Sequence, residues 1–136
     1  MAITKRREIG NVGEGIACRY LENNGFKVLE RNFLRKCGEI DVIAEKFNVI
    51  HFIEVKSVSR EISDTQLIKV SHETEGFRPE DNVNHKKLGK IKKTIQLYLM
   101  EKKLSETCEW VFDVITVSVD FNKRIGRVKM IKDIIL

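Results

Sequence analysis

The sequence predicts a mixed α/β domain in which one β-sheet is flanked by helices. Two segments, 4–24 and 83–103, repeat apolar residues at the spacing of an amphipathic helix. Five shorter runs rich in apolar and β-branched residues are typical of strands. The order along the chain is one helix, three strands, one helix and two strands, which favours a mixed sheet with helices on its faces.

The N-terminal half is expected to form one helix and three strands. The helix at 4–24 ends at the stop signal Asn23-Asn24-Gly25. Its apolar positions are Ile9, Val12, Ile16, Ala17, Tyr20 and Leu21. The strands are predicted at 26–33, 39–45 and 49–56, and the three residues between the last two strands are few enough for a hairpin.

The C-terminal half begins with an acidic segment. Residues 57–81 lack a hydrophobic period and contain six acidic residues, so we expect a long acidic loop. The helix at 83–103 has Leu88, Ile91, Ile95 and Leu99 at helical spacing. A strand at 110–119 is apolar on both sides, as in a strand covered on both faces, and a last strand is expected at 124–131.

Composition limits the class of protein. A chain of 136 residues suffices for a single domain, 1–136, with one ordinary core. No apolar run approaches the ~18 residues of a membrane span, and the basic N-terminus lacks the apolar stretch of a secretory signal. We therefore expect a cytoplasmic protein with no membrane partner. The three cysteines lack a CxxC pair and the three histidines lack an i,i+4 pair, which predicts reduced thiols and argues against a His/Cys metal site.

Candidate catalytic residues lie on the second and third strands. Alternation places Glu54 and Lys56 on one face of their strand. If the hairpin turns at residues 47–48, opposed residue numbers sum to 95, and Asp41 lies directly opposite Glu54. A three-residue loop would instead place Asp41 opposite Ile53, so the register depends on the turn.

Two opposed acids are destabilising unless a cation lies between them. Carboxylate oxygens with room for water suit Mg²⁺ or Mn²⁺, which activates water and neutralises phosphate charge. Lys56 would add a positive charge beside the attacking water or the developing phosphorane oxygens. Glu14 is a third acid, beside the apolar stripe of the first helix, and Gly10 and Gly13 would let that helix approach the sheet closely.

Each of these residues also has an ordinary interpretation. A Glu-x-Lys sequence on a strand is most often a solvated ion pair, and Glu14 alone would be an exposed helix residue. Asp113, with Val111, Ile115 and Val117 on the same strand face, is predicted to be a buried, hydrogen-bonded acid rather than a metal ligand. The combination of acids and lysine is what favours a site for metal-dependent phosphodiester hydrolysis.

A family resemblance supports the same residues. It is carried by Gly10-Asn11-Val12-Gly13-Glu14, Ala17, Tyr20-Leu21, Gly25, Asn32, Gly38-Glu39-Ile40-Asp41 and Phe52-Ile53-Glu54-Val55-Lys56, with Lys87 and Phe112-Asp113-Val114 continuing it at lower density. With these residues the chain closely resembles the YraN-like family of small uncharacterised bacterial proteins. That family looks like a branch of the PD-(D/E)XK nuclease superfamily, which is related to archaeal Holliday junction resolvases.

The resemblance implies a restriction-endonuclease-like αβββαβ core. In that core Asp41 and Glu54 would bind the metal, Lys56 would be the catalytic lysine, and Glu14 would complete the site. The chain departs from the family pattern after the Glu-x-Lys, where members often have a small residue and then arginine. Here Ser57-Val58 intervene and arginine comes only at position 60.

The basic second helix is the predicted nucleic-acid surface. Segment 83–103 contains seven lysines and one acid. The residues expected to contact a phosphate backbone are Lys86, Lys87, Lys90 and Lys93. The alternatives are a solvated helix face, a membrane-surface helix, or a surface for an acidic protein partner.

Together these features predict a Mg²⁺- or Mn²⁺-dependent endonuclease that acts on branched or structured DNA. The first alternative is a catalytically silent nucleic-acid-binding module of the same fold. The second is a protein-interaction domain. By analogy with resolvases, which match the two-fold symmetry of junctions, a homodimer is also expected.

Overall fold

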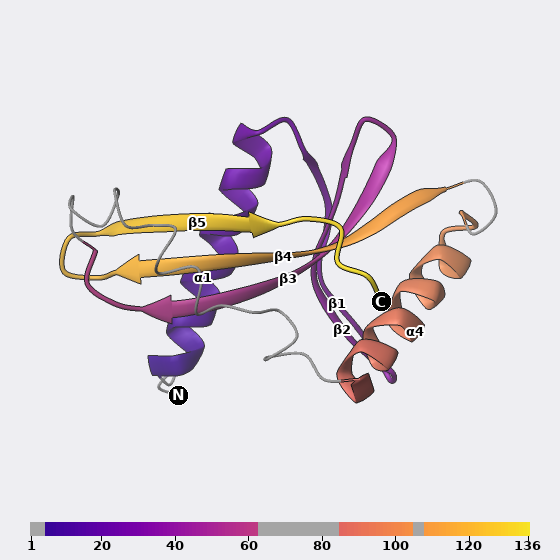
Figure 1. The fold of residues 1–136 in the computed structure, drawn as a ribbon, viewed down its shortest axis with the longest axis horizontal. Coiled ribbons are helices and arrows are strands. Elements are labelled where there is room, and N and C mark those ends of the chain that lie inside the picture. Colours follow the sequence, from indigo (N-terminus) through magenta and orange to yellow (C-terminus); the bar gives the residue numbers. More distant parts are fainter. Residues whose placement is uncertain (1–4, 63–84, 105–107) are drawn as a thin grey trace.

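A computed structural model describes residues 5–62, 85–104 and 108–136 of the chain. The elements are α1 (Lys5–Asn23), β1 (Lys27–Arg35), β2 (Gly38–Lys46), β3 (Val49–Ser59), α4 (His85–Glu101), β4 (Glu109–Asp120) and β5 (Ile125–Ile131). The strands form one sheet in the order β1-β2-β3-β4-β5. β3 and β4 are parallel and the other neighbours are antiparallel. The predicted mixed sheet with flanking helices is confirmed, and the architecture is consistent with a restriction-endonuclease-like core (Figure 1).

The predicted helices and strands are all present, with ends that differ by a few residues. The prediction that the acidic loop begins at residue 57 is wrong, because β3 continues to Ser59 and pairs with β4 as far as Ser59↔Val119. Beyond the strand, the backbone N–H of Ile62 donates to Asp120 Oδ2 at 2.9 Å. The rest of the predicted loop, from residue 63, lies outside the described residues. Neither described helix is long and apolar enough to cross a membrane.

The β2–β3 hairpin has a two-residue turn. Phe47 and Asn48 both have positive φ, at 52° and 64°, as a type I′ turn requires. The register includes Lys46↔Val49 and Ile43↔Phe52, so opposed residue numbers sum to 95. The predicted register is confirmed as far as Val42↔Ile53, and the three-residue alternative is excluded.

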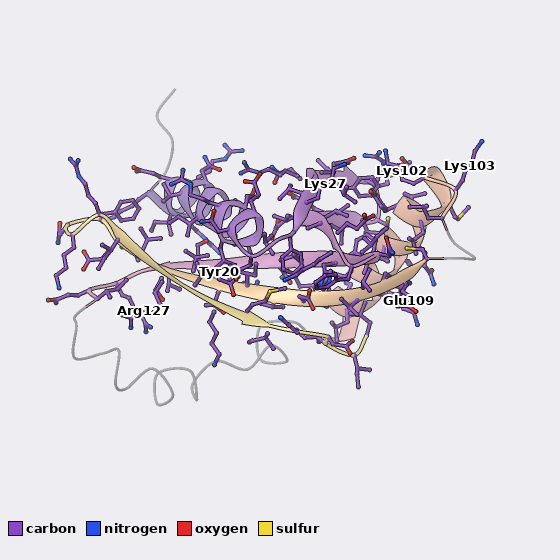
Figure 2. All side chains as sticks on the ribbon, turned by 90° about the horizontal axis from the view of Figure 1, so that it is seen from above. Tyr20, Lys27, Lys102, Lys103, Glu109 and Arg127 are labelled. Carbon is purple, nitrogen blue, oxygen red and sulfur yellow. The ribbon has the colours of Figure 1, made fainter. Side chains whose placement is uncertain are left out.

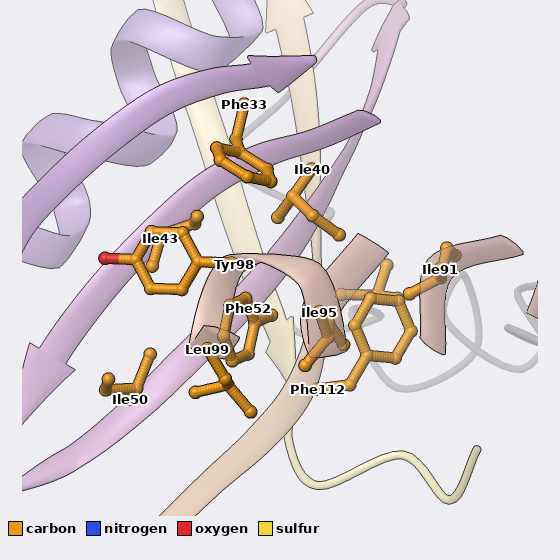
Figure 3. Close-up of a cluster of buried hydrophobic side chains, with 11 residues drawn as sticks. Phe33, Ile40, Ile43, Ile50, Phe52, Ile91, Ile95, Tyr98, Leu99 and Phe112 are labelled. Atoms are coloured by element: carbon orange, nitrogen blue, oxygen red, sulfur yellow. The ribbon is translucent and has the colours of Figure 1, made fainter. Parts of the chain in front are cut away.

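The two helices cover opposite faces of the sheet. On the α4 face, Ile91, Ile95, Tyr98 and Leu99 pack against residues of β1 to β4 (Figure 3). The Tyr98 ring lies edge-on to Phe33 and Phe52, with centroid distances of 5.2 and 5.5 Å. The helical spacing read from the sequence therefore identified the buried side of α4.

On the other face, α1 approaches β3 closely. Ala17, Cys18 and Leu21 are buried there in a second apolar cluster. A Cβ at Gly13 would collide with Oγ of Ser57, so only glycine allows this approach. The expectation for Gly10 is wrong, because a Cβ there would meet nothing within 4 Å. All three cysteines are free thiols, as predicted.

Asp113 is fully buried and connects three parts of the fold. Its Oδ2 lies 2.6 Å from His51 Nδ1 on β3, and its Oδ1 accepts the backbone N–H of Asp133 at 2.8 Å. The prediction of a buried, hydrogen-bonded acid is confirmed. Its role is to hold the C-terminal residues and β3 against β4.

Candidate functional site

The candidate site lies where β2 separates from β3. The β2–β3 ladder ends at Val42↔Ile53, whereas β3 continues beside β4 to Ser59. Figure 1 shows β1 and β2 running steeply across the direction of β3, β4 and β5. Asp41 is the residue next to Val42, just beyond the end of this ladder. The twist of the sheet thus frees the end of β3 to carry polar side chains.

Asp41 uses its carboxylate where the ladder stops. Its Oδ2 accepts the backbone N–H of Val55 at 2.8 Å. The expectation that Asp41 forms a ladder pair with Glu54 is therefore corrected: the register holds as far as Val42, and a side-chain contact replaces the next pair. This contact still ties Asp41 to the segment of β3 that carries Glu54.

Glu54 is shared by two lysines. Its Oε1 lies 2.7 Å from Lys87 Nζ on α4 and 3.4 Å from Lys56 Nζ on β3. Its side chain is only 16% exposed, and its Oε2 is buried with no hydrogen-bond partner. One oxygen of this carboxylate is therefore paired, while the other lacks the partner that buried polar atoms normally have.

The electrostatics of the site oppose the charge on Asp41. Burial raises the pKa of Asp41 to about 6, the N–H of Val55 offsets part of this rise, and nearby Glu14, Glu54 and Glu39 add to it. An acid in this environment holds its negative charge at a cost in free energy at neutral pH. A cation bound nearby would remove that cost.

The pKa values of the two lysines shift in opposite directions. Burial lowers the pKa of Lys56, and the neighbouring Lys87 lowers it further against the attraction of Glu54. Burial is the largest single influence on Lys87 and acts to lower its pKa, but the hydrogen bond to Glu54, the contact with Lys56 and the charges of Glu54 and Asp41 together outweigh burial, so the pKa is raised. Lys87 is therefore the main partner of Glu54.

Glu14 lies at the margin of the site. It projects from α1, and its Oε1 is 3.6 Å from Arg31 Nη2 on β1. It is near enough to contribute to the raised pKa of Asp41. Within 5–62, 85–104 and 108–136, however, no three histidine, cysteine or acidic side chains gather in a group that could hold a metal ion. The structure therefore pairs Glu54 with Lys56, holds Asp41 against the same segment of β3, and leaves Glu14 beside them.

The four lysines of α4 that were predicted to contact nucleic acid divide into two sets. Lys86, Lys90 and Lys93 are exposed and share one helix face at i, i+4 and i+7. Lys87 turns toward the sheet and contacts Glu54. Sequence reasoning grouped Lys87 with the exposed lysines, although its spacing of four residues from Ile91, a residue of the buried stripe, already indicated the inner face. Arg31 was also missed, and no sequence pattern pointed to it.

The fold and site define a small α/β protein with an acid-and-lysine cluster on a twisted mixed sheet of restriction-endonuclease-like architecture. Residues 13–117 match the Uncharacterised protein family UPF0102. The chain belongs to this family, which confirms the YraN-like resemblance.

Relatives in the same family come from different bacteria. A UPF0102 protein of Clostridium botulinum strain 657 is 38% identical over 127 residues, which is 93% of each chain. One from Clostridium tetani is 36% identical over the same share of both chains. One from Campylobacter lari is 44% identical over 97 residues, 71% of this chain and 73% of the relative.

Proposed function

We propose that this protein is a metal-dependent endonuclease that hydrolyses phosphodiester bonds in branched or otherwise structured DNA. The observation that carries the proposal is the site at the end of the β2–β3 ladder. There, Asp41 has a raised pKa and is held to β3 by the N–H of Val55, and Glu54 has a buried, unpartnered oxygen and lies beside Lys56. Burying these acids and this amine costs folding free energy that apolar residues would not cost. Such a cost is typical of functional sites, where stability is given up for activity.

The carboxylates fit a hard divalent cation. Glu54 Oε2 is free to accept one, and a cation would relieve the repulsion around Asp41. Oxygen ligands of this kind suit Mg²⁺ or Mn²⁺, with Glu14 proposed as an outer third acid. When bound, such an ion lowers the pKa of a coordinated water and neutralises charge on a phosphate.

Lys56 and Lys87 have separate roles in this proposal. Lys56, 29% exposed, is the amine that can reach a phosphate oxygen or an attacking water beside Glu54. Lys87 holds Glu54 Oε1 at 2.7 Å and fixes the orientation of the carboxylate. Lys87 is thus a positioning residue that acts through Glu54.

The exposed lysines of α4 supply the surface for the nucleic-acid backbone. These lysines are Lys86, Lys90 and Lys93, and Lys86 is adjacent in sequence to Lys87, which contacts Glu54 in the site. Contacts of this type bind phosphates without reading bases, so binding should depend strongly on salt and on DNA shape. A DNA substrate also places the protein in the cytoplasm.

A cleavage assay tests the proposal. Junction, flap and linear DNA are incubated with Mg²⁺ or Mn²⁺ and the wild type, Asp41→Ala, Lys56→Ala, or the matched surface control Lys103→Ala. Cleavage by the wild type and the control, with loss in the two site variants, supports the proposal. Cleavage that survives both site substitutions, or none by the wild type with any metal, contradicts it.

A silent nucleic-acid-binding module is the second candidate. It is favoured by the two ammonium groups that already lie within 3.4 Å of Glu54 Oε1 and neutralise this acid without a metal. It predicts DNA binding that is indifferent to Asp41→Ala, is weakened by charge reversal at Lys86 and Lys90, and leads to no turnover.

The proposal includes a homodimer, because a two-fold substrate is matched by a two-fold protein. Sedimentation of the protein with and without a four-way junction tests this part separately. A monomer under both conditions would remove the dimer and leave the proposed chemistry intact.

A further inference from the structure

The sheet face that carries Glu54 and Lys56 continues onto β4 and β5. Residues paired side by side share a face, so the register defines rows that cross the three strands. The successive rows are Glu54–Val114–Ile131, Lys56–Thr116–Lys129 and Val58–Ser118–Arg127. The face on the other side carries Ile115, Val117 and Val128 against α1. Figure 2 shows Arg127 on the side of the sheet away from α1.

Unpartnered polar atoms gather on this face. In the part of the chain that the structure describes, the buried side-chain nitrogen and oxygen atoms without a hydrogen-bond partner are Glu54 Oε2, Thr116 Oγ1 and Arg127 Nη1. Each belongs to a different one of the three successive rows. Because each such atom costs free energy, a ligand that hydrogen-bonds to this strip would remove a cost that the protein alone does not.

We propose that Thr116 and Arg127 form a phosphate-binding subsite that leads a nucleic-acid strand across β4 and β5 to Glu54 and Lys56. This inference rests on the proposed function and adds a second contact region, distinct from the lysines of α4. Nothing in the sequence pattern pointed to it.

The chemistry of the strip matches a phosphodiester. Thr116 can donate an O–H and Arg127 an N–H, which are the donors that phosphate oxygens accept. The two residues are diagonal neighbours across the β4–β5 pair, a separation that a long side chain spans. Lys56 and Lys129 flank Thr116 in its row and add positive charge.

The acid further along this face does not oppose an anion at Thr116. Asp120 shares the face, but its carboxylate already accepts the backbone N–H groups of Ile62, Asn122 and Lys123. These donors stabilise the charge of Asp120, so Asp120 does not depend on Arg127 as a partner.

The test measures binding without turnover. Fluorescence anisotropy of a labelled four-way junction and a labelled linear duplex is followed in EDTA over a series of salt concentrations. The variants are Arg127→Gln and Thr116→Val. Arg19→Gln, an exposed arginine on α1, removes the same charge on the other side of the sheet and serves as the control.

Arg127→Gln should weaken binding roughly tenfold and reduce the slope of log K against log salt by about one, because one phosphate contact is lost. Thr116→Val should weaken binding about threefold with an unchanged slope, while its melting temperature stays at or above that of the wild type. Arg19→Gln should change little. A purely structural Thr116 would instead melt lower when its hydroxyl is removed.

The outcomes separate this subsite from the proposed function. If both strip variants bind like Arg19→Gln while cleavage still requires Asp41 and Lys56, the subsite is wrong and the nuclease proposal stands. If binding falls as expected but no metal supports cleavage, the subsite stands and the nuclease proposal fails. If the wild type binds no nucleic acid at the lowest salt, both are overturned.

Discussion

Replacing Asp41 by asparagine should stabilise the metal-free protein at and above neutral pH. The amide oxygen of asparagine can still accept the N–H of Val55, so the contact at the end of the ladder is kept. What changes is the charge, which burial and the neighbouring acids disfavour in the folded state. This substitution is therefore expected to raise the free energy of unfolding.

The size of the effect follows from the pKa. The carboxyl group titrates near its ordinary value of 3.8 in the unfolded chain and at about 6 in the fold. The raised pKa of Asp41 thus costs no folding free energy below pH 3.8, where the group is protonated in both states. The cost grows as the pH rises toward 6 and is complete above it. Each pKa unit is worth about 1.36 kcal/mol, so the loss above pH 7 is about 3 kcal/mol. The asparagine variant would not suffer this loss, because an amide does not titrate in this range.

Urea unfolding at pH 3, 5 and 8 measures the difference between Asp41→Asn and the wild type. We expect a gain of about 3 kcal/mol at pH 8, about half of that at pH 5, and almost none at pH 3. The matched control is Glu22→Gln on the exposed side of α1, which should change little at any pH. MgCl₂ should stabilise the wild type at pH 8 and leave Asp41→Asn unchanged. A variant that is less stable than the wild type at pH 8 would refute the reasoning.

Three further predictions concern other parts of the structure. Gly13→Ala should destabilise the fold by about 1–3 kcal/mol in urea unfolding, because the new Cβ would collide with Ser57 of β3. Gly15 has open space around it, so Gly15→Ala should stabilise the helix by up to about 1 kcal/mol. Equal effects of the two would contradict the close approach. Phe47→Asn should raise the free energy of unfolding by about 1 kcal/mol, because asparagine tolerates a φ of 52° better; a lower value would argue against the turn type. In the wild type the ammonium of Lys87 competes with a cation for Glu54 Oε1, so Lys87→Met should bind Mg²⁺ roughly tenfold more tightly in calorimetry. The variant should nevertheless cleave DNA more slowly, because Glu54 is no longer held in place. Weaker Mg²⁺ binding by the variant would rule out the positioning role of Lys87.

Local patterns in the sequence predicted most of the fold. Apolar spacing identified the buried side of α4, and the observed β2–β3 register is the one expected for a two-residue turn, one of the two turns that the sequence left open. The buried state of Asp113 also followed from its apolar neighbours on the strand. These features depend on residues close in sequence, whose spacing is set by helix and strand geometry.

The sequence could not predict how the acids of the site are partnered. The register placed Asp41 near Glu54, but the end of the ladder and the bond to Val55 depend on how β2 twists away from β3. The position of Lys87 depends on the packing of α4 across a sheet whose strands lie far from it in the chain. Side-chain partners of this kind are decided by long-range packing.

The sequence by itself therefore determined the helices, the strands and the identity of the acids and lysine on β2 and β3, and it limited the hairpin register to two possibilities. Only the tertiary structure decided which lysine pairs with Glu54, and that Thr116 and Arg127 lie on the same face as that acid. The physical reason is that residue spacing fixes which side of an element a residue occupies. Burial and the absence of a partner arise only when strands from both halves of the chain are assembled into one sheet.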